Sequence, residues 1–160
     1  MSRFAELNKN IGSVVATLLS SQNLCKYLYY TNDTPLTQPD ITDTKVLLFK
    51  NIYPTPIIPQ VQDEVKSLLT IVLDGFALNR TNSAVKSSKI IFNLLTHIDI
   101  WPMTGTGLLR PYAILNEIDE LFNGSRIVGI GRTFFESGNW ISVNDKFQGY
   151  RLVYKIDDLN

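Results

Sequence analysis

His97 is the only histidine of this 160-residue chain, so proton transfer by an imidazole near neutral pH would depend on it alone. A metal site with two histidines is impossible, and a serine–histidine–aspartate system would have to use His97. The residue falls in a strand-like run, 89–100, where we expect it to be partly buried or at a sheet edge. A hydrolase or nucleotide-modifying enzyme is therefore the weakest of the alternatives considered below.

Two glycine-containing stretches resemble phosphate-binding loops only in part. Gly129-Ile130-Gly131 lies inside a predicted strand, without a further glycine or lysine at the spacing of a phosphate loop. The run Thr104-Gly105-Thr106-Gly107 precedes a predicted helix, where free amides can hold an anion, but a flexible hinge is the simpler interpretation. The carboxylates also lack metal-loop spacing, and Asp157-Asp158 is interpreted as surface. We expect no enzyme activity, no metal and no cofactor.

The charge of the chain is balanced, with 15 basic and 15 acidic residues. A formal net charge of zero gives no general attraction to nucleic acid or to anionic membranes, and it permits self-association. The basic residues are scattered along the sequence. A phosphate-binding patch would require the fold to bring together Arg110, Arg126, Arg132 and Lys146.

Cys25 is the only cysteine, so no disulfide forms within the chain, and a reducing cytosol is the simplest place of synthesis. We interpret Cys25 as a small buried hydrophobic residue. The first ten residues contain Arg3, Glu6 and Lys9, so we expect no signal peptide. No apolar run approaches the ~20 residues that span a bilayer, and we expect no membrane contact.

The first half of the chain predicts helices followed by a proline-rich segment. Apolar residues at three- and four-residue steps predict a helix over 4–19, in which Gly12 would mark a close approach of another backbone, and a shorter helix ends near Tyr29. The segment 30–62 reads mainly as an extended arm or loop, stiffened by its prolines. Its apolar side chains either cover the domain's own core or dock on a neighbour, and residues 45–52 fit a short strand or a helical turn.

The second half predicts a helix surrounded by strands. The runs 66–78 and 89–100 read as two paired antiparallel strands, and Gly75 as a bulge. A helix over 110–123 has an apolar stripe, an acidic face, Pro111 in its first turn and Gly124 as its cap. The expected strands that follow this helix are 126–136, 140–143 and 149–157, with a turn at Ser137-Gly138-Asn139 between the first two.

This order of elements predicts one α+β domain, 1–160, with a mainly antiparallel sheet of four to five strands. The N-terminal helical part covers 1–29, the arm or loop covers 30–62, and the α+β body covers 63–160. The N-terminal helices and the helix at 110–123 are expected to pack on the sheet.

Three stretches together resemble the small neck proteins of tailed bacteriophages, and the element order is similar to that of tail terminators. The first contains Leu24-Cys25-Lys26-Tyr27-Leu28-Tyr29-Tyr30 and residues 35–41. The second is Asn51-Ile52-Tyr53-Pro54-Thr55-Pro56-Ile57-Ile58-Pro59. The third begins with Leu109-Arg110-Pro111-Tyr112, includes Ile130-Gly131-Arg132 and Asn144-Asp145-Lys146-Phe147, and ends with Gly149-Tyr150.

The resemblance implies a structural virion protein that joins tail to head, assembles in the host cytoplasm and carries no catalytic residues. It implies a ring of identical copies, commonly six-fold, in contact with neck, connector and tail tube proteins, through whose lumen DNA passes without specific binding. One patch would be the stiff proline arm and the other a sheet edge near Trp140 or Tyr150. The candidate contact residues are Tyr53, Pro54, Pro56, Ile57, Ile58, Trp101, Arg132, Trp140 and Lys146.

Two further interpretations stay open beside the tail terminator. A head–tail adaptor beneath the portal is the near alternative, although adaptors are usually more helical than this strand-rich sequence. A small intracellular regulator would instead bind a host protein through the acidic face of the helix at 110–123.

Overall fold

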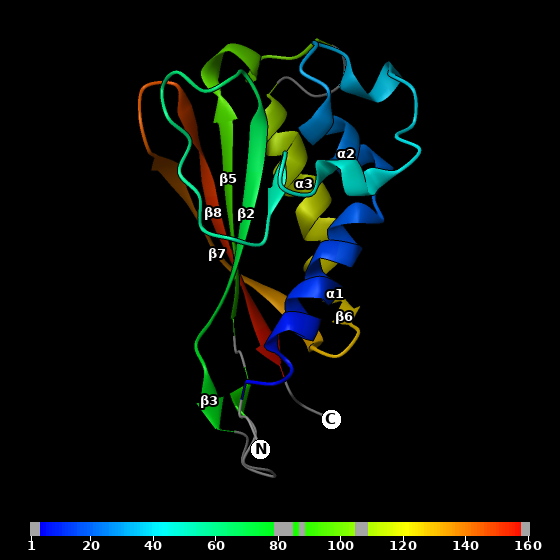
Figure 1. Cartoon of the computed structure of the whole chain (residues 1–160), viewed down its shortest axis with the longest axis vertical. Helices are drawn as coiled ribbons and strands as arrows, with labels where there is room; N and C mark the ends of the chain where they lie inside the picture. The colour runs from blue at the N-terminus through cyan, green and yellow to red at the C-terminus, as the bar shows by residue number, and fades with distance from the viewer. Residues whose placement is uncertain (1–3, 79–84, 87–88, 105–108, 158–160) are drawn as a thin grey trace.

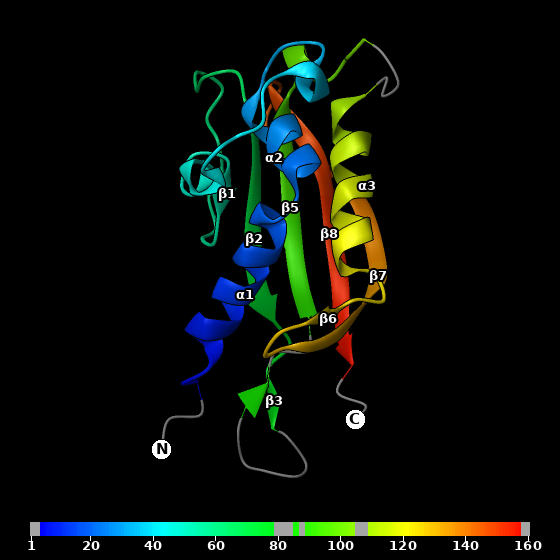
Figure 2. The same ribbon diagram turned by 90° about the vertical axis from the view of Figure 1, so that its right-hand side faces the viewer.

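In the described part of the chain, six strands form one sheet in the order β1-β2-β5-β8-β7-β6, and three α-helices pack on one of its faces (Figures 1 and 2). The computed structural model describes residues 4–78, 85–86, 89–104 and 109–157. Only β1 and β2 run parallel; the other neighbouring pairs in this sheet are antiparallel. The strands are β1 (Ile52–Tyr53), β2 (Ser67–Asp74), β5 (Lys89–His97), β6 (Arg126–Ile127), β7 (Gly131–Ser142) and β8 (Phe147–Asp157).

The predicted α+β class, with a mainly antiparallel sheet and helices packed on it, is confirmed. The sheet has six strands because a two-residue strand joins each end of the four long ones. The predicted pairing of the runs 66–78 and 89–100 is also confirmed, as β2 and β5. β2 ends at Asp74, however, and Gly75, with φ of +72°, leads into a separate hairpin of β3 (Ala77–Leu78) and β4 (Val85–Lys86).

Both predicted N-terminal helices are present, α1 at Leu7–Leu19 and α2 at Gln22–Tyr29. The Ser21 hydroxyl caps α2 by accepting the Leu24 N–H at 3.1 Å, which satisfies an amide that the helix itself leaves free. Gly12 does not mark a close approach of another backbone, because its Cβ position is open. Cys25 is fully buried in the core, and burial raises its pKa to about 11, which confirms its interpretation as a small hydrophobic residue.

Alternation along the strands divides the apolar side chains between the two faces of the sheet. Leu69, Leu94 and Tyr154 belong to the main core beneath the helices. The neighbouring residues in β2 and β5, Leu68 and Leu95, point to the other face and form a small cluster with three more residues. The members of this second cluster are Tyr53, Leu68, Leu95, Phe147 and Ile141.

The segment 30–62 is more structured than an extended arm. It contains two 3₁₀ turns, η1 (Pro35–Thr37) and η2 (Thr44–Leu47), followed by β1. Ile41, Leu47 and Ile52 are buried in the main core, so this segment covers its own domain. The sequence left open whether residues 45–52 form a helical turn or a strand. They contain both, because η2 ends at Leu47 and β1 begins at Ile52.

β7 differs most from its prediction. The expected turn at Ser137-Gly138-Asn139 is wrong, because these residues continue one 12-residue strand that pairs with β8 as far as Ser142. Glu136 is an extra residue between Phe135 and Ser137, which oppose successive residues of β8, so it forms a β-bulge. Gly129 and Ile130, expected inside a strand, instead lie in the turn between β6 and β7, and Gly131 begins β7; both glycines have positive φ.

α3 spans Arg110–Phe122 and ends, as predicted, before Gly124, whose φ is +74°. Its first residue is a fully buried arginine. The Arg110 guanidinium donates to the carbonyl oxygens of Ile100, Tyr27, Tyr30 and Asn32 at 2.6–2.9 Å. Desolvation lowers its pKa, whereas the nearby charge of Asp33 favours the charged form. One side chain thus joins the start of α3 to the end of α2 and to the turn before α3.

Replacement of Arg110 by alanine is expected to reduce the free energy of unfolding by about 3–5 kcal/mol, because buried carbonyls lose their donors and a cavity remains. Lysine should recover only part of this loss, since one ammonium cannot reproduce the planar arrangement of donors. Urea unfolding would measure both changes. Arg132→Ala is the matched control, since exposed Arg132 should change stability by no more than about 0.5 kcal/mol. An Arg110→Ala protein as stable as this control would contradict the assignment.

Candidate functional site

β7 is the most exposed of the four long strands of the sheet. β6 pairs only with Gly131 and Arg132, and β7 is otherwise the last strand on this side among the described residues. Trp140, on this edge, is 60% exposed, which is unusual for so large an aromatic side chain. The sheet edge near Trp140 is therefore available for contact, whereas Tyr150 lies on β8, an interior strand, and does not provide an edge.

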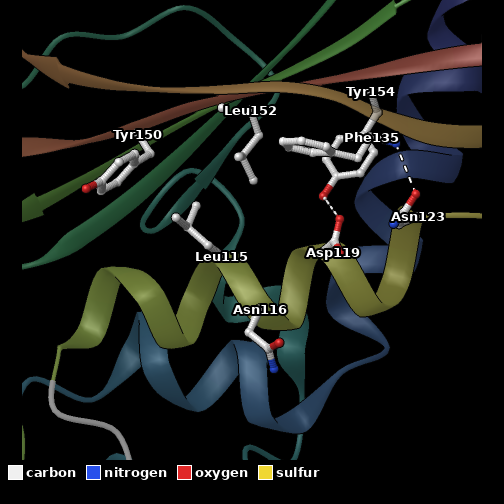
Figure 3. Close-up of a pocket in the computed structure, with 9 residues that line it drawn as sticks. Leu115, Asn116, Asp119, Asn123, Phe135, Tyr150, Leu152 and Tyr154 are labelled. Carbon is white, nitrogen blue, oxygen red and sulfur yellow. Dashed lines mark hydrogen bonds between the residues drawn. The ribbon is translucent and has the colours of Figure 1, made fainter.

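A groove of about 420 Å³ runs between α3 and this side of the sheet (Figure 3). Leu115 and Leu152 point toward each other across it from the helix and from β8. Gly138 lines the groove from β7, and a Cβ atom there would lie 3.1 Å from the Leu152 side chain. The lining residues are Leu115, Asn116, Asp119, Asn123, Phe135, Gly138, Tyr150, Leu152 and Tyr154.

Two hydrogen bonds fix one end of the groove (Figure 3). The Tyr154 hydroxyl donates to the Asp119 carboxylate at 2.7 Å, and the Phe135 N–H donates to Asn123 Oδ1 at 3.1 Å. Burial raises the pKa of Tyr154, and the hydrogen bond and charge of Asp119 raise it further. The groove can accept apolar groups beside this fixed polar end, but these contacts do not constitute a reactive group.

The acidic face of α3 is only partly a solvated surface. Asp119 is turned toward the sheet, and Glu117 is half-buried beside Asn23 of α2. Burial raises the pKa of Glu117, and the neighbouring Glu120 adds to the increase. The surface expected for a host-protein regulator is therefore smaller than the sequence indicates.

The predicted contact residues lie at separate places and do not form one patch. Tyr53 is 9% exposed, and its hydroxyl donates to the Lys50 carbonyl, so it belongs to the protein's own packing. Trp101 is half-buried and donates through Nε1 to the Thr96 carbonyl at 3.0 Å. Arg132 and Trp140 are exposed at different positions of β7, and Lys146 is half-buried in the turn before β8.

The proline segment presents its apolar residues on the surface near the small cluster. Ile58 is 66% exposed, Ile57 and Pro56 are exposed, and Pro54 is half-buried. Buried Pro59 is held by Asn144, whose side-chain amide donates to the Pro59 carbonyl at 2.9 Å. The segment is therefore anchored to its own sheet, while Ile57 and Ile58 stay available to a neighbour.

The groups considered for chemistry have structural surroundings. His97 is buried at the end of β5, where Nδ1 accepts the Asp99 N–H at 3.1 Å and the ring packs edge-on against Phe147. The four basic residues do not assemble into a patch, since Arg110 is buried and Lys146 lies at the opposite end of β7 from Arg126 and Arg132. The Thr104–Gly107 loop falls mostly outside the described residues. Among the described residues, no three His, Cys, Asp or Glu side chains form a metal-binding group, and no helix is long and apolar enough to cross a membrane.

A profile of the YomW family matches residues 21–156, which is most of the chain. The chain belongs to the YomW family. The family name indicates a phage-associated protein, which agrees with the general part of the resemblance described above. The YomW match begins at the N-cap of α2 and ends at the next-to-last residue of β8, so it includes nearly the whole sheet and all residues that line the groove. No curated protein sequence matches the chain.

Sequence reasoning missed the groove of this YomW-family fold, because its lining comes from three separated elements. It also treated Arg110 as one of several scattered basic residues. The position of Arg110 beside Pro111 in the first turn was visible, but its carbonyl partners have no side-chain signature in the sequence.

The raised pKa of Tyr154 predicts a pH dependence of stability. The phenol titrates near pH 10 in the unfolded chain. Because its pKa is higher in the folded protein, its contribution is complete below about pH 10 and is lost as the pH rises further. Tyr154→Phe should reduce the free energy of unfolding by about 1–2 kcal/mol at pH 7. Between pH 10 and pH 11, the free energy of unfolding of this variant should decline less than that of the native protein.

Urea unfolding at pH 7, 9, 10 and 11 would test this prediction. Tyr29→Phe is the control, because it removes the hydroxyl of a different tyrosine, which lies in α2. An alkaline decline in Tyr154→Phe as large as that of the native protein would show that another group causes it.

Proposed function

We propose that this chain is a structural subunit of a phage particle, a ring-forming tail terminator or neck protein that joins the tail to the head connector. The observation that carries the proposal is the uncovered β7 edge with exposed Trp140, in a chain of a family whose name is phage-associated. The sequence resemblance to neck proteins supports the same place in the particle.

A closed ring requires two different patches, so that each copy contacts the next through unlike surfaces. Ile57 and Ile58 supply one apolar patch on a segment that Asn144 anchors, so it loses little conformational freedom when a neighbour binds. The balanced charge of the chain suits a lumen through which DNA passes without being held.

The strand content favours a terminator over an adaptor beneath the portal. Adaptors are usually more helical, whereas the long strands of this chain form a six-stranded sheet with helices on one face. The adaptor is the alternative within the same particle.

A small protein-binding regulator is the second candidate function, and the groove beside α3 is the observation that favours it. Such a protein would bind one host partner and would be absent from finished particles. Affinity purification from infected cells distinguishes the two, because a subunit should bring down virion proteins.

Deletion of the gene from its phage, followed by electron microscopy of the lysate, tests the proposal. We expect filled heads and free tails that do not join, and we expect a plasmid copy of the gene to restore joined particles. A plasmid copy with Ile57→Ser and Ile58→Ser should restore fewer joined particles than one with Val128→Ser, which changes an exposed valine in the β6–β7 turn. Joined, infective particles without the chain would overturn the proposal.

A further inference from the structure

The backbone groups at the outer edge of β7 have a definite direction. The Val143 N–H donates to the Phe147 carbonyl, so it points toward β8. Because backbone groups of successive residues point to opposite sides of a strand, those of Asn139 and Ile141 also point toward β8. The N–H and C=O groups of Gly138, Trp140 and Ser142 therefore point outward, away from the sheet.

The two halves of this edge differ in how they are protected. Before the bulge, the outward Thr133 N–H donates to the Ser125 carbonyl and the outward Phe135 N–H to Asn123. After the bulge, the run 137–143 contains no charged residue and no proline, which are two of the usual means of protecting an exposed edge. No strand of the described part of the chain covers the outer half of β7, which is thus open to another strand.

Gly138 and Trp140 have complementary shapes on the same face of the sheet. Gly138 lies opposite Leu152 and Trp140 opposite Tyr150, and both of these β8 residues line the groove beside α3. Gly138 has no side chain and leaves space above the strand, whereas the large side chain of Trp140 can fill such a space. An aromatic side chain across from an edge glycine is a recurring arrangement in sheets.

We propose that β7 of a second copy of this chain pairs with this edge, antiparallel, about a two-fold axis through Asn139. In this register Gly138 of each copy lies opposite Trp140 of the other, and their outward N–H and C=O groups hydrogen-bond. The indole of each Trp140 then packs over Gly138 of the other copy and against Phe135 and Leu152 in the groove of that copy. The two Asn139 residues face each other as a pair without backbone hydrogen bonds.

This contact does not depend on the proposed place in the particle. Two-fold pairing closes on itself and yields a dimer of the free chain, whereas in the proposed ring the same edge would instead contact the Ile57 and Ile58 patch of the next copy. The dimer is the form expected for the purified chain.

Cysteine cross-linking tests the register. Cα atoms of directly opposed residues that do not hydrogen-bond lie about 4.5 Å apart, within the range that a disulfide spans. Asn139→Cys should form a disulfide-linked dimer under mild oxidation, while Ser137→Cys and Ile141→Cys should each stay monomeric on denaturing gels and link only when mixed. The native protein is the control, since Cys25 is buried.

Sedimentation of unmodified variants tests the contact itself. Trp140→Lys should weaken dimerisation at least about tenfold, Trp140→Phe should retain it, and Val128→Lys should leave it unchanged. A native protein that stays monomeric at high concentration, with no Asn139→Cys cross-link, would overturn the proposal. Self-linking at Trp140→Cys instead of Asn139→Cys would overturn the register. If the purified chain dimerised but the gene-deletion phage still formed normal particles, the proposed function would be refuted and the dimer contact would stand.

Discussion

The buried Arg110 guanidinium imposes the strongest constraint on this fold. A positive charge without exposure to water is tolerated only when its donors are matched by acceptors, and here four carbonyl oxygens from three separate places supply them. The end of α2, the residues that follow it and the turn before α3 must therefore be in position together. This requirement couples the N-terminal half of the chain to the body that contains the sheet.

The position of α3 then determines the shape of the surface beside β7. The helix lies over β8 and β7. The hydrogen bonds of Arg110 hold its first residue, and its buried side chains Ile114, Ile118 and Phe122 hold it along its length. The bond between Asp119 and Tyr154 keeps its later turns close to the sheet, and the groove forms where the lining side chains are too short to fill the space between them. Packing in the core and the open surface thus have a common origin.

Much of the fold could be predicted from periodicity, and much of the site could not. The apolar stripe of α3 and Gly124 defined that helix, and the β2–β5 pair followed from two strand-like runs. Gly138 and Asn139 favour a turn by local propensity, and pairing with β8 overrides that preference. Trp140 was predicted as a contact and is exposed, but Tyr53 and Trp101 are occupied by backbone carbonyls that sequence patterns do not show.

Because of the bulge at Glu136, the curvature of β7 can change without a change in its pairing with β8. Phe135 and Ser137 oppose successive residues of β8, so the ladder has the same alignment on both sides of the extra residue. Loss of this one residue would leave every cross-strand pair intact; it would remove the ion pair between Glu136 and Lys89 and change the bend and the local twist. The angle at which the outer half of the strand leaves the body can therefore vary between related chains by a single insertion or deletion, without any change in the side chains that it presents.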